Sequence, residues 1–535
     1  MLVPHPQFDR VRLVKLGQTV CLGCTLSVLS LQVRAGSEFQ INSYTIETQY
    51  QPAISHDSQG SFVVVWASWA QDGQSFGVFA QPFDGDGSFL GSELPVNSFT
   101  LGRQMFPSIS HDPSGGFVVI WSSEGEDGSS WGVFGQRFES RGEVGSEFQI
   151  NTYTLSGQLF PAVSHDPRGN FIVVWASGSQ DGYYGGIFAR QFDSVGRPLG
   201  PEMQINVFTR SAEVDPAISH DSSGGFVIAW SNSNIYARRF DSFGNPLGSG
   251  FLVNTHTFDN QENPTVSHGS SGRFVIAWDS FGQDGASDHN KGIFAQRYES
   301  DGTPLGSEFQ VNTFTFSYQS WPTIAQDPYG GFTILWQSEL QDHYGRGVFG
   351  QRFDSSATPI GGELQVSTVE NSDDWRPRVS VGPEGSIVAA WQGFFLDGSE
   401  GGIFGRRFMA PRLDVGDAVV FEGNSGTVVM VFTVQLASSA EIEVREVRVS
   451  YTTIDGSARA GRDYVPITGP LTIPPGTTEA AIAVTIIGDT ILERTETLFL
   501  SLYNPHGAIL GDSVGEGILV NDDRPWNLPH PPRAE

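Results

Sequence analysis

A block of about 54 residues is written seven times in this chain of 535 residues, and this repetition limits the possible folds more than any other feature. Each copy carries one Trp in a run of β-branched and aromatic residues, and the copies follow at intervals of 48 to 58 residues. The seven tryptophans are Trp66, Trp121, Trp175, Trp230, Trp278, Trp336 and Trp391. A period of this length with several short strands is typical of a propeller blade. Seven blades would close a ring without leaving an open sheet edge.

Four strands are expected in each copy, and the third copy illustrates them. Residues 161–166 are a short apolar run that ends at a tight-turn sequence, in which Pro sets φ and Gly accepts positive φ. Residues 171–175 form a continuous apolar run, as expected of a strand buried on both faces. Residues 186–192 alternate apolar and polar, and residues 202–206 are edge-like. No segment of ten or more residues has a helical apolar period, so the repeat region is predicted to be all-β.

The phase of the repeat predicts how the ring closes. The chain enters the repeat at residues 36–42, which match the fourth strand of a blade, and leaves it at residues 402–408, which match the third. The last blade would therefore take one strand from residues 38–42, since a single blade does not bury both of its faces alone. Residues 36–409 are thus predicted to be a seven-bladed β-propeller whose last blade is closed by an N-terminal strand.

The formal charge of −29 argues against a nucleic-acid partner or an anionic membrane, because phosphate binding needs clustered Lys and Arg. No stretch outside the first 35 residues is long and apolar enough to span a bilayer, so no transmembrane segment is predicted. We expect a monomer whose partner is an extracellular protein or glycan.

Residues 1–35 are predicted to be a signal peptide or leader. Basic residues precede a mostly apolar run at 20–33, and a small residue follows at Ala35, as in secretory signals. Both cysteines, Cys21 and Cys24, lie here. Lipid attachment at Cys24, a metal or redox pair, and a leader without a secretory role remain alternatives. The location expected from this segment is secreted or at the cell surface.

A second domain is predicted at residues 411–524, where the repeat stops and the composition changes, followed by a Pro-rich tail at 525–535. Short strands alternate there with Gly, Pro and Asp turns over about 110 residues, which indicates a β-sandwich. The expected strands are 427–436, 444–453, 480–487, 497–503 and 517–520.

Four ordered motifs in this domain carry a family resemblance. They are Tyr451-x-Thr453-x-Asp455-Gly456-x-Ala458-x-x-Gly461-x-Asp463-Tyr464, Pro475-Gly476, Ile486-Ile487-Gly488-Asp489-x-x-x-Glu493-x-x-Glu496 and Asn521-Asp522-Asp523. With them, residues 413–523 resemble Calx-beta domains. The resemblance implies a seven-stranded sandwich, like the regulatory domains of sodium–calcium exchangers, that binds Ca²⁺ at one end through loop carboxylates.

Six acidic positions match the family's ligand pattern. They are Glu422, Asp463, Asp489, Glu493, Asp522 and Asp523. Ca²⁺ takes six to eight oxygen ligands, and two carboxylates about 4 Å apart repel by about 4 kcal/mol at an effective dielectric near 20. A cation would relieve that repulsion. Gly488 and Asn521 depart from the pattern, because many members carry an acid at both positions, so fewer ions or weaker binding are expected. The alternative is a purely structural sandwich with solvated turns.

In the propeller, Ser-His-Asp recurs at 55–57, 110–112, 164–166 and 219–221. Adjacent residues on a strand point to opposite faces, so this His and Asp do not pair as a catalytic triad requires. An enzyme also has no use for four copies of one site. We interpret these residues as hydrogen-bonding groups at strand ends and turn starters.

Six copies place an Asp six residues after the Trp, in loops that would open on one face of a propeller. They are Asp72, Asp127, Asp181, Asp284, Asp342 and Asp397. Such an acidic ring, with aromatic neighbours, is a possible ligand face for a sugar, a protein or cations. Turn chemistry alone, with Asp-Gly closing a hairpin, explains the same residues.

No motif commits the chain to catalysis, and no catalytic residue is predicted. The predicted function is a non-catalytic secreted or cell-surface binding or adhesion protein with a calcium-binding Calx-beta module. The alternative is a secreted carbohydrate-active enzyme, sialidase-like or lyase-like, with its site in the propeller face.

Overall fold

The computed structural model describes residues 36–139, 142–182, 184–206, 212–285, 290–343, 345–369, 372–394, 396, 398, 400–408, 411–437 and 446–523. The predicted leader 1–35, the candidate ligand-face residue Asp397 and the predicted tail 525–535 lie outside these residues. The described residues form strands and turns, and no helix among them is long and apolar enough to cross a membrane. The prediction of an all-β fold is confirmed.

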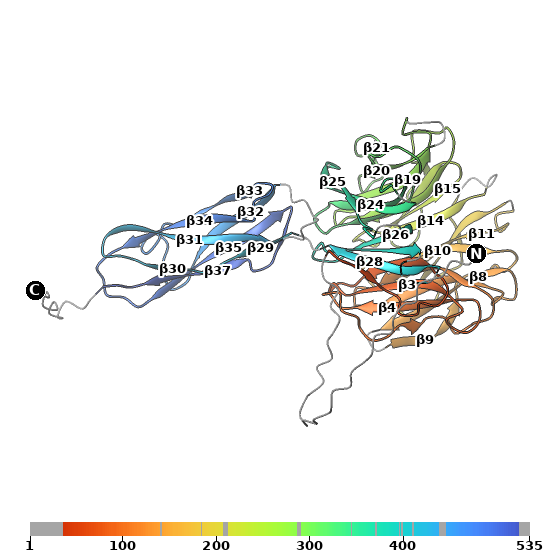
Figure 1. The fold of residues 1–535 in the computed structure, drawn as a ribbon, viewed down its shortest axis with the longest axis horizontal. Coiled ribbons are helices and arrows are strands. Elements are labelled where there is room, and N and C mark those ends of the chain that lie inside the picture. The colour runs from red at the N-terminus through yellow and green to blue at the C-terminus, as the bar shows by residue number, and fades with distance from the viewer. Residues whose placement is uncertain are drawn as a thin grey trace, which may run out of the picture. The chain divides into compact units, whose positions relative to one another are not determined.

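Seven antiparallel sheets of four strands follow one another in the described part of residues 38–408 (Figure 1). The first complete one contains, in spatial order, β2 (Gln49–His56), β3 (Phe62–Trp69), β4 (Phe76–Phe83) and β5 (Leu94–Pro95). The next two contain β6 (Gln104–His111), β7 (Phe117–Glu124), β8 (Trp131–Glu139), β9 (Gly142–Gln149), β10 (Gln158–His165), β11 (Phe171–Ser177), β12 (Gly186–Phe192) and β13 (Met203–Gln204). The three after these contain β14 (Val214–His220), β15 (Phe226–Ser231), β16 (Ile235–Phe240), β17 (Phe251–Leu252), β18 (Gln261–His268), β19 (Phe274–Phe281), β20 (Lys291–Tyr298), β21 (Phe309–Gln310), β22 (Gln319–Gln326), β23 (Phe332–Glu339), β24 (Arg346–Phe353) and β25 (Pro359–Gln365).

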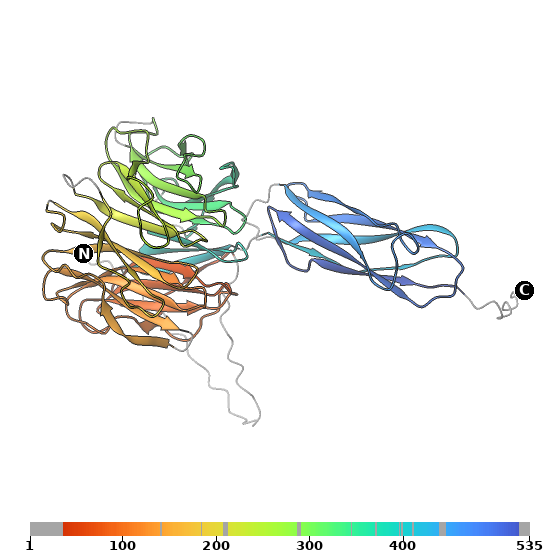
Figure 2. The same cartoon turned by 180° about the vertical axis from the view of Figure 1, so that it is seen from behind.

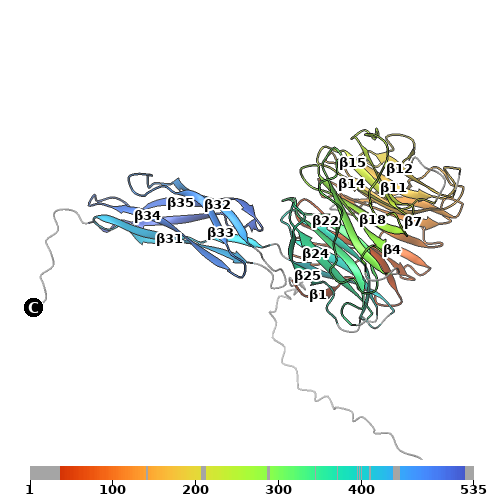
Figure 3. The same cartoon turned by 90° about the horizontal axis from the view of Figure 1, so that it is seen from above.

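The seventh sheet is shared between the two ends of the repeat region. It contains β26 (Asp373–Val381), β27 (Ile387–Phe394), β28 (Gly402–Phe408) and, from the other end, β1 (Glu38–Gln40). Glu38 pairs with Arg406 and Gln40 with Phe404. The first strand of each sheet lies next to its counterpart in the neighbouring sheet, and β26 returns to β2. The sheets lie side by side as blades (Figure 3). The predicted seven-bladed propeller, closed by an N-terminal strand, is confirmed.

Packing between blades explains the continuous apolar run of the second strand in each. In β3, Phe62, Val64 and Trp66 pack against the seventh blade, while Val63 and Val65 pack against the second. A strand between two neighbours buries both faces, so alternation with polar residues disappears. Trp66 is fully buried, and losing such a ring costs about 3–5 kcal/mol. The repeated Trp is therefore a folding residue.

An Asn follows the outer strand in six of the seven blades, and Ser367 holds this position in the remaining blade. Asn151 Oδ1 accepts a hydrogen bond from the backbone N–H of Val133 at 2.7 Å. Its Nδ2 donates to the carbonyl of Tyr153 at 2.9 Å and to Gln158 Oε1 at 3.1 Å. The equivalent bonds of Asn42 and Asn312 follow the same pattern. The repeated Gln-Ile-Asn and Gln-Val-Asn segments thus satisfy buried backbone groups that would otherwise be costly.

Residues 412–520 form two further sheets, whose long strands are visible in Figure 2. One sheet has the order β34 (Glu479–Gly488), β31 (Gly426–Ala437), β29 (Arg412–Val415) and β36 (Ile509–Leu510). The other has the order β30 (Ala418–Phe421), β37 (Val514–Val520), β35 (Glu496–His506), β32 (Val447–Asp455) and β33 (Thr468–Ile473). Alternate residues of β31 face the core, namely Met430, Phe432, Val434 and Leu436. This is the predicted sandwich.

The sandwich contains nine strand segments among the described residues, whereas the resemblance implies seven strands. The difference arises at the first and last strands, each of which changes sheet partway. β29 pairs in parallel with β36 in one sheet, and β30 pairs in parallel with β37 in the other. Gly416 and Gly511 lie at the two breaks. Counting each interrupted strand once restores the number seven.

Candidate functional site

Three carboxylates converge at one end of the sandwich. Oxygen atoms of Asp463, Glu493 and Glu496 all lie within 4.8 Å of one another. Asp463 comes from the turn after β32, Glu493 from the loop between β34 and β35, and Glu496 from the start of β35. Of these, Asp463 and Glu493 are among the predicted ligands, whereas Glu496 was not assigned that role although it belongs to the same motif.

The motif around Asp463 explains why this carboxylate is held in place. Tyr464 Oη donates to Asp455 Oδ1 at 2.7 Å, and the buried ring anchors the turn. Asp463 Oδ2 accepts from the backbone N–H of Arg459 at 2.7 Å. The Asp463 carbonyl accepts from the N–H of Ile487 at 2.9 Å, which ties the turn to β34. The Asp463 side chain is therefore buried in a fixed orientation at the end of the sheet.

One cation of the chain lies among these acids. Arg462 Nε lies 3.5 Å from Asp463 Oδ1, and its Nη2 forms an ion pair with Glu493. Burial raises the pKa of Glu496, as do the neighbouring carboxylates of Asp463 and Glu493, while Arg462 opposes them. The raised pKa thus reflects first the burial of the Glu496 carboxylate and then its repulsion by the two neighbouring carboxylates. The cluster thus carries three carboxylates and one guanidinium.

A second group of predicted ligands surrounds Asn521. Asn521 Nδ2 donates to Glu422 Oε1 at 2.6 Å and to the carbonyl of Ile491 at 3.0 Å. Burial raises the pKa of Glu422, and so do Asp489, Asp523 and Glu493 in that order, against the hydrogen bond from Asn521. Asn521 therefore joins the loop after β34 to Glu422 by hydrogen bonds. An Asp at this position would add a further negative charge and would lack this donor.

The remaining predicted positions are placed differently. Asp522 Oδ1 accepts from the N–H of Gly423 at 3.1 Å, so it stabilises the loop after β30 and is not one of the three convergent acids. At Gly488, a Cβ atom would lie 2.4 Å from the Gly423 carbonyl oxygen and 2.6 Å from that of Glu422. No side chain fits there without a backbone shift, which accounts for the glycine.

The propeller Asp residues lie in the hairpin loops between the second and third strands. Asp72 Oδ1 accepts from the N–H of Gln74 at 3.1 Å, and Asp127 Oδ1 from that of Ser129 at 2.9 Å. Each carboxylate also folds back over a glycine of the third strand. A Cβ at Gly77 would lie 2.6 Å from Asp72 Oδ2. The same back-folded arrangement is found at Asp127, Asp181 and Asp342, whereas the Asp284 atom that a Cβ at Gly292 would meet is its own Cβ. The carboxylates of Asp72, Asp127, Asp181 and Asp342 therefore point toward their own blades, and those of Asp72 and Asp127 also stabilise their turns.

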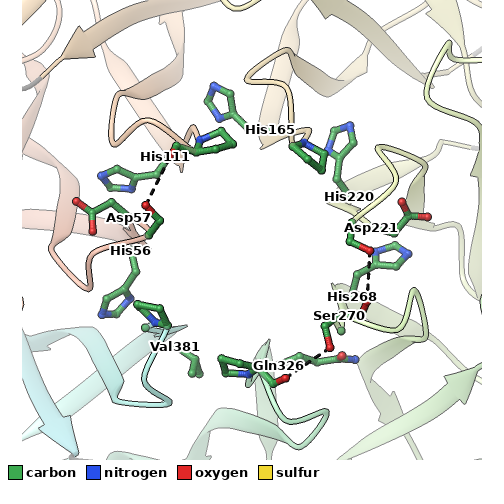
Figure 4. A pocket seen from close by; sticks show the side chains of 18 of the residues that line it. His56, Asp57, His111, His165, His220, Asp221, His268, Ser270, Gln326 and Val381 are labelled. Atoms are coloured by element: carbon green, nitrogen blue, oxygen red, sulfur yellow. Dashed lines mark hydrogen bonds between the residues drawn. The ribbon is translucent and has the colours of Figure 1, made fainter.

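The Ser-His-Asp copies surround the opposite mouth of the central channel, which holds a cavity of about 460 Å³. Figure 4 shows the imidazoles turned away from the opening. His56 Nδ1 lies 2.7 Å from Ser380 Oγ, and His165 Nδ1 lies 3.0 Å from Ser110 Oγ, so each ring bridges to the preceding blade. Burial lowers the pKa of His165 to about 4. Asp57 accepts from the N–H groups of its own turn. These contacts agree with the predicted hydrogen-bonding role at strand ends.

A Calx-beta domain is found by comparison at residues 417–523. The chain is 34% identical over 98 residues to the sodium/calcium exchanger Calx of Drosophila melanogaster, covering 16% of this chain and 10% of the exchanger. It is 42% identical over 67 residues to sodium/calcium exchanger 2 of Rattus norvegicus, covering 12% of this chain and 7% of the exchanger. The chain thus spans a tenth or less of the length of the curated relatives it matches.

Three solved structures are similar to parts of the chain. The apo form of the Calx CBD1 domain has a TM-score of 0.19 and 27% identity, covering 21% of this chain and 98% of that one. A protein of unknown function from Dyadobacter fermentans has a TM-score of 0.44 and 10% identity, and the match covers 70% of this chain and 98% of that one. An alpha-L-arabinanase from Penicillium chrysogenum, complexed with arabinobiose, has a TM-score of 0.42 and 13% identity, and the match covers 58% of this chain and 94% of that one.

Proposed function

We propose that the Calx-beta domain at residues 417–523 binds Ca²⁺ at its acidic end, within a non-catalytic binding protein that acts outside the cell or at its surface. The observation that supports the Ca²⁺ site is the convergence of Asp463, Glu493 and Glu496 within 4.8 Å. Oxygen ligands lie 2.3–2.6 Å from Ca²⁺, so two ligands of one ion are separated by at most about 5 Å. The observed separations meet that limit.

The donor set also fits Ca²⁺ in its chemistry. All three convergent groups are carboxylates, which are the ligands of hard cations, and no His or Cys belongs to the group. Glu422, Asp489 and Asp523 also lie close to this end of the sandwich, where their carboxylates add to the negative charge. A bound Ca²⁺ would neutralise these carboxylates. Asp463, Glu493 and Glu496 would hold the ion, with Glu422 and Asp523 as further oxygen donors.

Arg462 determines how the metal-free site is stabilised. Its guanidinium contacts Asp463 and Glu493, two of the proposed ligands. A carboxylate that is ion-paired with Arg462 is less available as a ligand. Ca²⁺ binding therefore competes with Arg462, which lowers the affinity relative to a site without an internal cation.

A binding role for the propeller is supported by how its repeated polar residues are used. Asp72 and Asp127 of the hairpin loops stabilise turns, and His56, His165 and His220 form hydrogen bonds between blades. The rigid ring then presents its loops and channel to a partner, which we take to be an extracellular protein or glycan. Residues 1–35 supply the argument for secretion.

The second candidate function is a secreted carbohydrate-active enzyme. One observation favours it, namely that acidic and basic side chains occur in the channel wall of only some blades, as described below. Catalysis requires such broken symmetry. A screen of chromogenic glycosides with the full chain would show turnover if this alternative holds.

Calorimetric titration of the full chain with Ca²⁺, after chelator treatment, tests the Ca²⁺ site. We expect saturable binding that Asp463→Asn and Glu496→Gln each weaken at least ten-fold. Glu479→Gln is the matched control, because Glu479 is exposed and starts β34 at the end opposite Gly488. No heat and no shift in the melting temperature at millimolar Ca²⁺ would remove the proposal, as would equal losses in the control.

A further inference from the structure

The first strand of every blade is interrupted at the same place. One residue in each has φ between 51° and 57°, and the strand pairing shifts register there. These seven bulge residues are Gln51, Phe106, Phe160, Asp215, Asn263, Trp321 and Arg376. Each directly precedes a proline. Left-handed backbone at a non-glycine residue costs about 1–3 kcal/mol, and such strain gathers at functional sites.

The bulge redirects these side chains toward the channel. A β-bulge re-aims a side chain relative to a regular strand, and all seven bulge residues line one cavity of about 350 Å³. Gln49 at the start of β2 pairs with Ser68 near the end of β3, so this cavity opens on the side of the hairpin loops. The opposite mouth carries the repeated Ser-His-Asp residues.

The seven bulges share one backbone conformation, but their side chains differ sharply. A residue needed only for folding is expected to repeat, as the Trp does in all seven blades and the Asn does in six of them. Phe106 and Phe160 make an apolar wall, with ring centroids 4.7 Å apart in an edge-to-face arrangement. Asp215 and Asn263 follow in the next two blades, and then Trp321 and Arg376. The ring therefore has an aromatic side and a polar, charged side, as recognition of one asymmetric ligand requires.

Two guanidinium groups on the charged side have no carboxylate within ion-pair distance in the described part of the chain. Arg376 lies 4.4 Å over the ring of Trp321, and Arg378 Nη1 donates to the carbonyl of Pro377. Among the described residues, no carboxylate forms an ion pair with either group, although Asp215 is close enough to act on Arg376 through charge. Burial and the neighbouring Arg376 lower the pKa of Arg378 to about 10. In a chain with a formal charge of −29, such a pair favours an anion at this spot.

A buried ion network fixes the polar wall. Asp279 is fully buried and accepts from Asn263 Nδ2 at 2.8 Å and from the backbone N–H of Trp321 at 3.1 Å. Lys291 Nζ lies 3.1 Å from Asp279 and 2.6 Å from Glu262. The first four blades have Ala or Ser at the position of Asp279, namely Ala67, Ser122, Ala176 and Ser231. The network therefore belongs to one sector of the ring and orients Asn263 and Trp321 there.

We propose that this cavity binds an anionic sugar: the carboxylate of a sugar acid on Arg376 and Arg378, and its ring between the polar wall and the aromatic wall. Hydroxyl groups would bond to Asp215 and Asn263. Trp321, Phe106 and Phe160 offer apolar faces to the ring. Three acids, Asp215, Glu262 and Asp279, occupy the same sector, so a monoanion fits better than a polyanion. This inference rests on the proposed binding role of the propeller and is independent of the Ca²⁺ site.

Titration of the full chain with glucuronate, galacturonate and N-acetylneuraminate tests the inference. Glucose and galactose are the neutral controls, and inorganic phosphate tests for a general anion site. We expect at least one sugar acid to bind at millimolar concentration or below, about ten-fold more tightly than the neutral sugars. Arg376→Gln and Arg378→Gln should each weaken it about ten-fold, because a charged hydrogen bond is lost. Arg273→Gln, an exposed arginine paired with Glu299, should leave it unchanged.

Three results would overturn the inference: binding of none of the sugar acids, equal binding of the neutral sugars or phosphate, and full binding by both arginine variants. Thermal melting of each variant shows whether a loss of binding is caused by a loss of the fold. If Arg376→Gln does not fold, the binding test relies on Arg378→Gln alone. Each titration is repeated with Ca²⁺ and with chelator. If no sugar acid binds, the result of the Ca²⁺ titration is unaffected. If Ca²⁺ does not bind, the sugar titration in chelator still tests the sugar site.

Discussion

In the propeller, the carboxylate of Asp127 accepts a hydrogen bond from the backbone of its own hairpin loop. In the sandwich, Asp463, Glu493 and Glu496 bring three carboxylates within 4.8 Å of one another. Both regions are acidic and loop-borne, yet their carboxylates face different partners. In the first set, Asp72 and Asp127 each accept a backbone N–H bond within their own turn. In the second set, Asp463 also accepts a backbone N–H bond, from Arg459, but the three carboxylates additionally face one another and one guanidinium. Composition alone does not identify a cation site, because the orientation of each carboxylate decides whether a cation is needed.

Asp463→Asn should have the largest effect, and most of that effect should appear only with Ca²⁺, since the lost ion pair with Arg462 adds a smaller cost to the metal-free domain. Binding to the folded state stabilises by about 2.7 kcal/mol at a hundred-fold excess over Kd, and the substitution should remove most of that gain. Thermal melting of the wild type and the variant, with and without Ca²⁺, measures the difference. A variant that keeps the full Ca²⁺-dependent rise would show that the ligands lie elsewhere.

Glu126→Gln probes the one described hairpin loop of the propeller where a carboxyl faces another carboxyl. Burial, and then Glu147, raise the pKa of Glu126 to about 8, while Ser123 opposes them. Gln71 and Gln180 hold the equivalent position in other blades and donate to Glu93 and Glu202. The site therefore resembles the acidic end of the sandwich more than its own repeat.

The sign of this effect follows from the direction of the shift. The folded state binds the Glu126 proton more tightly than the unfolded state, so its stabilising contribution is complete below pH 4.5 and declines as pH rises to about 8. Glu126→Gln should therefore stabilise the propeller by about 1 kcal/mol at pH 8, a value reduced by solvent screening, and by little at pH 4.5. Equal stabilisation at both pH values would contradict the assignment.

Asp72→Ala should cost about 1 kcal/mol through the lost hydrogen bond to Gln74, lowering the melting temperature by a few degrees. The loss should be the same with and without Ca²⁺, because the carboxylate points toward its own blade. Denaturant unfolding in both conditions checks this. If the cost depended on Ca²⁺, the ring of hairpin acids would be a cation face after all.

Arg462→Gln should have the smallest effect, and it should raise the affinity for Ca²⁺, whereas Asp463→Asn lowers it. Removing the guanidinium frees Asp463 and Glu493, so Ca²⁺ should bind a few-fold more tightly while the metal-free domain loses stability. Calorimetric titration and melting in chelator measure the two changes. Weaker Ca²⁺ binding in this variant would show that Arg462 supports the site and does not compete with the ion.

Much of the fold was predictable because its signals are periodic. The Trp spacing gave the number of blades, and the phase of the repeat gave the strand supplied by residues 38–42, since both depend only on counting along the chain. The sandwich followed from ordered motifs. Its first and last strands were harder, because Gly416-Asp417 and Gly511-Asp512 divide each of them into two short segments, and the sequence does not show that the segments pair in different sheets.

The site was predictable in part. Asp463 and Glu493 were predicted as ligands from their motif, whereas Glu496, which converges with them, was not, because its place beside them depends on how the start of β35 lies in the sheet. The six-residue spacing from the Trp identified the hairpin acids, although it does not reveal that Asp72 folds back over Gly77. The bulge residues gave no local signal, since a residue before proline prefers extended backbone, and Trp321 has φ of 54°. Packing around the channel imposes that conformation.

Differential scanning calorimetry of the full chain, in chelator and in millimolar Ca²⁺, most directly tests whether the two acidic regions differ in their need for a cation. We predict that one unfolding transition of the wild type moves to higher temperature with Ca²⁺. This transition is assigned to the sandwich because it no longer responds to Ca²⁺ in the Asp463→Asn variant. The midpoint temperature of the propeller transition should differ by less than about one degree between chelator and Ca²⁺. A Ca²⁺-dependent shift of the propeller, or none in the sandwich, would contradict this.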